Sequence, residues 1–243
     1  MDRWFLRFLL PVVFVCAACG GPDAARSSRA EKPAAPVERA SSSSTNPANV
    51  NAPRIVFLGD SLTAGYGLDK EDAVPALIQK RLQDAGYPYE VVNAGVSGDT
   101  SAGGLSRLDW SLAGDVKILV VELGGNDGLR GLPVAELKRN LTEIITRAQA
   151  KGIKVVLTGM EAPPNFGPAY TTEFRDVYRE LSRAHDVTFV PFYLEGVAGI
   201  PSLNIADGIH PNAEGSRIVE RTIWSALEPL LVKQTAAGKN PGR

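Results

Sequence analysis

The sequence predicts an α/β fold, a three-layer sandwich in which helices cover both faces of a central five-stranded parallel sheet. First, short apolar runs alternate with longer amphipathic segments from Arg54 onward, which is typical of βαβ units with right-handed crossovers. Second, the run 55–58 is rich in β-branched and aromatic residues and is stopped by Gly59. Such a run is typical of a parallel strand that is buried on both faces.

The individual elements follow this alternation along the chain. We expect strands at the short apolar runs 55–58, 89–93, 118–123, 154–157 and 188–192. We expect helices over the longer amphipathic segments 74–85, 102–112, 134–150, 171–184 and 213–232. The helix at 134–150 has the clearest pattern, because its apolar residues share one face and Pro133 stands at its start.

The chain before Arg54 predicts an exported protein. Arg3 and Arg7 accompany the apolar run 8–15, which has the length of a signal peptide and is too short to span a bilayer. Two alanines before Cys19 resemble a bacterial lipoprotein signal, in which this cysteine is acylated and becomes the amino terminus. Cys16 stands where such signals usually carry leucine, so secretion without a lipid is the alternative.

The domain organisation follows from these features. We expect 1–19 to be a signal peptide and 20–53, rich in alanine, serine and proline, to be a disordered linker with an end-to-end distance of roughly 30 Å. Residues 54–233 form the one domain that 243 residues favour, and 234–243 form a disordered tail. A lipid on Cys19 would anchor the domain to a membrane in the cell envelope or periplasm.

Composition excludes several classes of function. The formal net charge is -1, which gives no basic face for nucleic acid. Cys16 and Cys19 are the only cysteines, so the domain has no disulfide framework, thiolate nucleophile or cysteine-based metal site. The chain has two histidines and no His-x-x-x-His motif, which argues against zinc. We therefore expect no metal site.

Four polar segments are expected at one edge of the sheet. Three follow the first three strands, and the fourth precedes the last helix: Gly59-Asp60-Ser61, Asn93 to Thr100, Gly124-Gly-Asn126-Asp127 and Asp207-Gly-Ile-His210-Pro211. The carboxyl ends of parallel strands share an edge, where open α/β sheets bind ligands. Ser61 is the candidate nucleophile, because it follows a buried strand and lies near backbone N–H groups that favour negative charge.

His210 is the candidate general base. The other histidine, His185, ends a predicted helix, where a surface or capping role is expected. Asp207 lies three residues before His210, so its carboxylate can accept the Nδ1–H and leave Nε2 free to take a proton from a serine. A structural histidine at the start of a helix is the alternative interpretation.

Asn126 and Gly98 are candidate oxyanion donors. The amide of Asn126 can point into the cleft and donate to a developing negative charge, although asparagine also suits tight turns. Gly98 has no side chain, so its backbone N–H can approach a substrate oxygen, or it can simply form a turn. Four further polar residues are interpreted as hydrogen-bonding neighbours that organise the loops: Asp60, Asn93, Asp99 and Asp127.

Together the four segments resemble the sequence blocks of the SGNH (GDSL) hydrolases over 54–232. The resemblance implies a flavodoxin-like α/β/α fold with Ser61 as nucleophile, His210 as base and Asp207 orienting the histidine. It also implies an oxyanion hole formed by Gly98, Asn126 and the backbone N–H of Ser61, and no cofactor.

Longer stretches, such as Leu58 to Tyr66 and Val121 to Gly131, are similar to the bacterial thioesterase, lysophospholipase and arylesterase subgroup. This similarity implies a serine esterase that acts on small acyl esters or lysophospholipids through an acyl-enzyme. Apolar residues in the expected cleft loops favour an apolar acyl group over sugar acetates: Leu129, Leu132, 162–166, Val197, Ile200, Pro201 and Leu203.

Three alternatives remain open from the sequence. The first is a carbohydrate O-deacetylase of the same family. The second is a flavodoxin-like phosphate- or flavin-binding module with 60–65 as its phosphate loop, which leaves Asp207, His210 and Asn126 without roles. The third is a tethered lipid- or glycan-binding protein whose site is idle.

Overall fold

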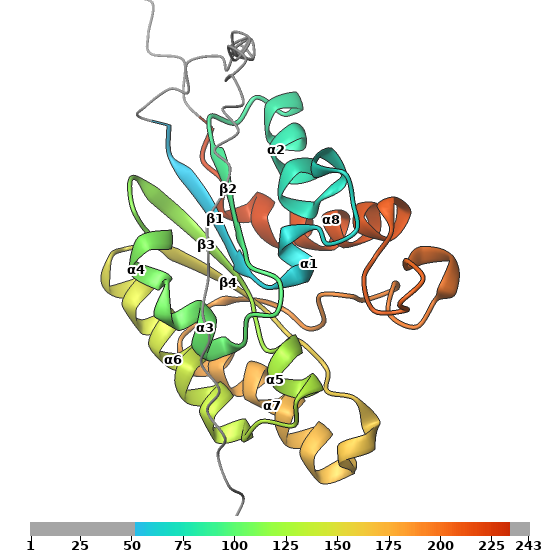
Figure 1. Ribbon diagram of the computed structural model, residues 1–243. Coiled ribbons are helices and arrows are strands. Elements are labelled where there is room, and N and C mark those ends of the chain that lie inside the picture. The colour runs from blue at the N-terminus through green and yellow to red at the C-terminus, as the bar shows by residue number, and fades with distance from the viewer. Residues whose placement is uncertain (1–51, 234–243) are drawn as a thin grey trace, which may run out of the picture. The chain divides into compact units, whose positions relative to one another are not determined.

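The computed structural model describes residues 52–233, and the expected signal peptide, linker and tail lie outside this range except for residues 52 and 53. A parallel sheet runs through the middle of the domain in the order β2-β1-β3-β4-β5 (Figure 1). Its strands are β1 (Arg54–Gly59), β2 (Glu90–Gly95), β3 (Val116–Glu122), β4 (Lys154–Thr158) and β5 (Thr188–Val190). The predicted five-stranded parallel sheet is therefore confirmed. β5 ends earlier than expected, at Val190, since Pro191 has no N–H to donate to a neighbouring strand.

β1 lies between β2 and β3 and pairs with both in parallel. Gly59, its last residue, is level with Gly95 of β2 and Glu122 of β3. The segments after these three strands therefore leave the sheet side by side. Because the strand order changes direction at β1, this edge is the switch point where open α/β sheets form their clefts.

Helices cover both faces of the sheet (Figure 1). α2 (Val74–Asp84) packs with α8 (Ala213–Leu227) on one face, while α3 (Ser101–Ser106), α6 (Val134–Ala150) and α7 (Pro168–Ala184) lie on the other. α6 has the predicted bounds. α8 ends at Leu227 and continues as η4 (Glu228–Leu230), because Pro229 cannot donate within an α-helix.

The helix expected at 102–112 is instead two short helices, α3 and α4 (Leu108–Ser111), which meet at Arg107. The Arg107 guanidinium donates from Nε to Asp99 Oδ2 at 2.6 Å, from Nη1 to the Ala94 carbonyl at 2.6 Å and from Nη2 to the Gly59 carbonyl at 2.8 Å. These bonds join the carboxyl ends of β1 and β2 to the loop that follows β2. The apolar periodicity of the segment gives no sign of this interruption.

Five one-turn elements were not predicted, because a segment of three to five residues shows no period. They are α1 (Ser61–Ala64), η1 (Lys70–Asp72), α5 (Gly125–Leu129), η2 (Pro164–Phe166) and η3 (Pro201–Leu203). α1 and α5 follow β1 and β3 directly, so two of the polar segments at the sheet edge are helical. Within residues 52–233, no helix is both long enough and apolar enough to cross a membrane.

Candidate active site

Ser61 is the first residue of α1, immediately after β1. Asp60 caps this helix, because its Oδ1 accepts a hydrogen bond from the Leu62 N–H at 3.0 Å. The Asp60 side chain is buried, whereas Ser61 is half-buried and lines a cavity. The turn is therefore fixed inside the domain while the serine remains open to a ligand.

His210 lies between Ser61 and Asp207. Its Nε2 is 2.8 Å from the Ser61 Oγ, and its Nδ1 is 2.6 Å from the Asp207 Oδ2. The other Asp207 oxygen, Oδ1, accepts the backbone N–H groups of Ile209 at 2.9 Å and His210 at 3.0 Å. The structure thus brings together a hydroxyl, an imidazole and a carboxylate in the order that acyl transfer through a serine requires.

The long connection between β5 and α8 carries Asp207 and His210, and its ends are held by backbone bonds. The Ile205 N–H donates to the His210 carbonyl at 2.8 Å, and the Asn212 N–H donates to the Leu203 carbonyl at 2.9 Å. Asn212 also caps α8 by accepting the Glu214 N–H at 3.0 Å. The histidine therefore stands on a loop that is anchored to the start of a long helix.

Asn126 and Gly98 lie on the two sides of β1. Asn126 is the second residue of α5, and its Nδ2 donates to Asp60 Oδ2 at 3.0 Å. Gly98 has a φ of 86° in the loop after β2, and its carbonyl accepts from Arg130 Nη2 at 2.9 Å. Asn126 lines the same cavity as Ser61 and His210, whereas Gly98 belongs to the adjoining loop.

The neighbouring polar residues connect the loops of the site, as interpreted from the sequence. Asp127 accepts the Ser101 hydroxyl at 2.6 Å and the Ser101 N–H at 2.8 Å. Asn93 donates from Nδ2 to the Thr63 carbonyl at 3.0 Å. Asp99 is the carboxylate that Arg107 binds. Within residues 52–233, no group of three or more histidine, cysteine, aspartate and glutamate side chains could hold a metal ion.

The cavity beside Ser61 has a volume of about 660 Å³ and a mostly apolar wall. Leu129 and the segment 162–164 line it, as predicted. The other residues expected there do not line it: Leu132, 165–166, Ile200, Pro201 and Leu203 lie outside its wall, and Val197 is fully buried in the core. Six apolar lining residues were not predicted: Leu62, Met160, Phe192, Leu194, Ala198 and Ile209.

A family model described as the GDSL-like Lipase/Acylhydrolase family matches residues 57–218. The chain belongs to this family. It is 48% identical over 181 residues to "Esterase TesA" of Pseudomonas aeruginosa, an alignment covering 74% of this chain and 90% of that protein. It is 39% identical over 162 residues to "Arylesterase" of Vibrio mimicus, covering 66% of this chain and 81% of that protein.

A further relative is "Thioesterase 1/protease 1/lysophospholipase L1" of Escherichia coli strain K12. It is 36% identical over 181 residues, covering 74% of this chain and 86% of that protein. The crystal structure of TesA superimposes with a TM-score of 0.70 at 47% identity, covering 73% of this chain and 99% of that one. This GDSL-like hydrolase is thus a serine esterase, and the phosphate- or flavin-binding alternative is not favoured.

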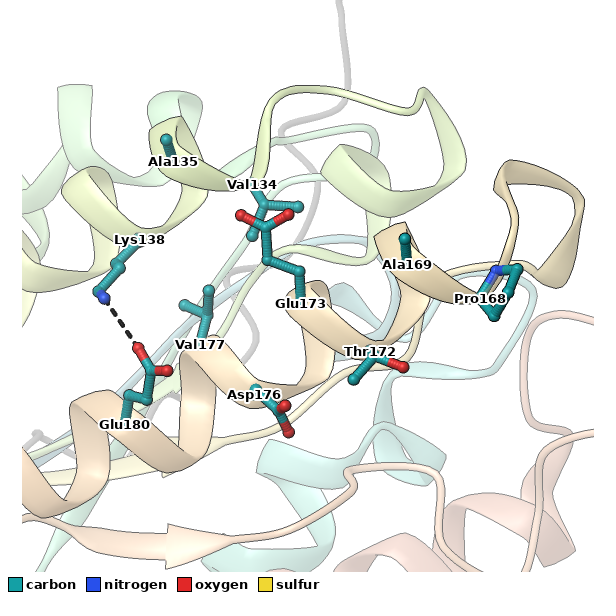
Figure 2. A pocket seen from close by; sticks show the side chains of 10 residues that line it. All are labelled: Val134, Ala135, Lys138, Pro168, Ala169, Thr172, Glu173, Asp176, Val177 and Glu180. Atoms are coloured by element: carbon teal, nitrogen blue, oxygen red, sulfur yellow. Dashed lines mark hydrogen bonds and ion pairs between the residues drawn. The ribbon is translucent and has the colours of Figure 1, made fainter.

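A second hollow, of about 760 Å³, lies between α6 and α7 of this GDSL-like hydrolase (Figure 2). Its wall carries the acidic side chains of Glu173, Asp176 and Glu180, and Lys138 Nζ lies 2.8 Å from Glu180 Oε2. Its lining residues all belong to the start of α6 and to α7. It is therefore separate from the cavity that Ser61, Asn126 and His210 line.

Three residues of this GDSL-like hydrolase site were not predicted from the sequence: Tyr66, Arg107 and Glu122. The Tyr66 ring lies 4.8 Å from the His210 ring, between centroids. Glu122 ends β3 with its side chain buried against α1. A glutamate inside the apolar run 118–123 was the signal that could have identified it.

Proposed function

We propose that Ser61, His210 and Asp207 form the catalytic triad of this esterase. The main support is the chain of two hydrogen bonds that runs from Ser61 Oγ through the His210 ring to the Asp207 carboxylate. The Ser61 oxygen attacks the ester carbonyl carbon while His210 Nε2 takes the hydroxyl proton. Asp207 holds the Nδ1–H tautomer and stabilises the imidazolium that forms.

The negative charge on the former carbonyl oxygen needs donors. We assign this role to the backbone N–H groups of Ser61 and Gly98 and to the Asn126 amide, which belong to the three segments that leave β1, β2 and β3 side by side. The imidazolium then protonates the leaving alcohol, and the acyl group remains on Ser61. A water molecule, activated by His210, releases the acid and restores the serine.

The test compares Ser61→Ala and His210→Ala with His185→Ala as a matched control, since His185 only ends α7. The two site variants should lose roughly 10⁴-fold to 10⁶-fold in kcat, because members of a triad act as a unit. His185→Ala should keep the activity. A phosphonate ester with a p-nitrophenyl leaving group should transfer its phosphonyl group to Ser61 of the wild type, release p-nitrophenol and leave Ser61→Ala unmodified. An active Ser61→Ala enzyme would overturn the assignment.

We propose esters with an apolar acyl group, lysophospholipids included, as the substrates. The apolar wall of the cavity, with Met160, Leu194 and Leu129 near Ser61 and His210, supports this proposal. Each buried methylene contributes about 0.8 kcal/mol, so four more carbons could raise kcat/KM by roughly two orders of magnitude. The measurement compares p-nitrophenyl acetate, butyrate, hexanoate and octanoate. A maximum at acetate with fast deacetylation of an acetylated oligosaccharide would favour a carbohydrate esterase instead.

We also propose that the protein is exported and that Cys19 carries a lipid anchor. Support comes from the basic start, the apolar run 8–15 and the two alanines before Cys19. Two or more acyl chains make anchoring stable, whereas one is marginal. Cys19→Ser should move the protein from the membrane to the soluble fraction, while Cys16→Ser should leave it anchored. An intact mass without added lipid would contradict the proposal.

A further inference from the structure

Glu122 is a buried acidic residue to which the proposed mechanism gives no role. Its side chain is 0% exposed and lies next to the turn that carries Ser61. Its Oε2 accepts the Asp60 N–H at 3.2 Å and the Thr63 hydroxyl at 2.8 Å. Glu122 therefore binds Asp60 and Thr63, one on each side of Ser61.

The packing around Gly59 shows how closely this contact is fitted. A Cβ on Gly59 would lie 2.6 Å from Glu122 Oε2 and 2.0 Å from Thr63 Oγ1. Real Cβ atoms do not approach so closely, so any side chain at this position would push the Glu122 carboxyl and the Thr63 hydroxyl away from the turn. The first residue of the Gly59-Asp60-Ser61 motif thus provides space for Glu122 to reach the turn.

The second oxygen of Glu122 indicates its protonation state. Within residues 52–233, Oε1 receives no N–H or O–H donor, and no lysine, arginine or histidine forms an ion pair with Glu122. The Asp60 carboxyl is also buried, and it lies close enough for its charge to raise the pKa of Glu122. Like charges that are buried close together disfavour each other's ionised form, so we expect one of the pair to carry a proton.

The surroundings place that proton on Glu122. Burial raises the pKa of Asp60 as well, but Asp60 accepts the Leu62 N–H and the Asn126 Nδ2–H, both of which stabilise its charged form. Glu122 is more deeply buried, and burial together with the Asp60 charge raises the pKa of Glu122 well above its usual range. Three other titratable side chains lie near the pair. The charge of His210 lowers the pKa of Asp60, and burial raises the pKa of the Tyr178 and Tyr193 hydroxyls well above the usual value.

We propose that Glu122 is a positioning residue that, as a neutral acid, accepts from the Asp60 N–H and the Thr63 hydroxyl and so fixes the turn that carries Ser61. Asp60 Oδ2 accepts one Nδ2–H of Asn126, which leaves the other for the oxyanion. The connection runs from Glu122 through Asp60 to Asn126, and directly from Glu122 to both sides of Ser61. This inference rests on the proposed roles of Ser61 and Asn126.

The test uses Glu122→Gln and Glu122→Leu. Glutamine is neutral and has nearly the same shape, and its carbonyl can accept from the Asp60 N–H and the Thr63 hydroxyl. We expect Glu122→Gln to remain within about threefold of the wild-type kcat. Glu122→Leu should lower kcat by roughly 10-fold to 100-fold while KM for p-nitrophenyl acetate changes by less than about threefold, because the effect lies in transition-state stabilisation.

Glu220 supplies the matched control, because it is also a buried glutamate but pairs with Arg81 on the face where α2 and α8 pack. Glu220→Gln and Glu220→Leu should lower the melting temperature and leave kcat unchanged. A loss of kcat in Glu122→Gln as large as that in Glu122→Leu would mean that the charge is needed and would overturn the proposal. A fully active Glu122→Leu enzyme would also overturn it.

An infrared difference spectrum reports the protonation state of the Glu122 carboxyl directly, independently of any effect on folding. Wild type minus Glu122→Gln at neutral pH should contain the carbonyl stretch of a protonated carboxylic acid; carboxylate bands alone would contradict a neutral Glu122. This measurement needs no turnover, so it applies even if Glu122→Leu does not fold. It also distinguishes the role of Glu122 from that of Ser61. An active Ser61→Ala enzyme would rule out Ser61 as the nucleophile, and it would not change the infrared evidence for a neutral Glu122.

Discussion

At the scale of single residues, Asp207 is held as a carboxylate by three hydrogen bonds. Two come from the backbone N–H groups of His210 and Ile209, and the third from the His210 ring. They lower the pKa of Asp207 from 3.8 to about 2. The residue that orients the histidine therefore stays ionised at every pH at which an esterase would work.

The pH dependence of stability follows from this lowered pKa. A carboxylate whose pKa is lower in the folded state stabilises the fold above its ordinary pKa of 3.8, and this contribution is lost as the pH falls toward 2. We expect the melting temperature of the wild type to exceed that of Asp207→Asn at neutral pH, and the difference to shrink through this window. A constant difference down to the lower pH would show that the carboxylate charge is not involved.

Asn126 supports a second prediction at this scale. Removing one oxyanion donor should lower kcat by about 10²-fold to 10³-fold in Asn126→Ala, with little change in KM, because the contact forms mainly in the transition state. Asn165→Ala, in the short helix η2 near the cavity rim, is the control and should behave as wild type. An unchanged kcat with a raised KM would assign Asn126 to ordinary substrate binding.

At the scale of elements, Arg107 joins the carboxyl ends of β1 and β2 to the loop that contains Gly98. Its guanidinium reaches three acceptors at once, and it does so from the break between α3 and α4. The same segment carries Asp99, one residue after Gly98. The break in the expected helix therefore fixes the loop of one proposed oxyanion donor relative to the strand that precedes Ser61.

Arg107→Lys tests this arrangement, because an ammonium group cannot reproduce a planar fork of donors. We expect Arg107→Lys to lower kcat by about 10-fold or more, and Arg107→Ala to lower it further, with smaller changes in KM. Arg217→Lys is the matched control, since Arg217 of α8 forms an ion pair with Asp72 of η1, away from the strand ends. Equal kcat in wild type and Arg107→Lys would show that the fork is not needed.

At the scale of the whole molecule, one core supports the site. The central strands β1 and β3 are buried along nearly their whole length, and helices pack on both faces of the sheet. Fully burying each of these aliphatic or aromatic side chains contributes about 1.5–3 kcal/mol. The domain proposed over 54–233 should therefore fold without the segments on either side of it.

This proposal is tested with residues 52–233 alone. The fragment should keep kcat/KM for p-nitrophenyl butyrate within about twofold of the intact protein, because the cavity and the triad lie inside it. It should no longer associate with membranes. The full chain with Cys19→Ser is the control, since it lacks only the proposed lipid, and inactivity of a folded fragment would show that a flanking segment contributes to the site.

The sequence by itself determined the parallel sheet, the long helices and the grouping of Ser61, Asn126 and His210 at one edge. These features are local, since a strand or a long helix shows its period within its own residues, and the strand ends of a parallel sheet necessarily meet. The resemblance to the family likewise depends on short sequence motifs, which can be recognised without knowledge of the tertiary contacts.

Only the tertiary structure decided which side chains of the connecting segments face the cavity and which are buried. Val197 packs into the core instead of the cleft, Arg107 interrupts a helix to bind two strand ends, and Glu122 reaches beneath the Ser61 turn. Each outcome depends on partners far away in the sequence, such as Gly59 and Asp60 for Glu122. Loop side-chain directions are set by such distant contacts, and no local period encodes them.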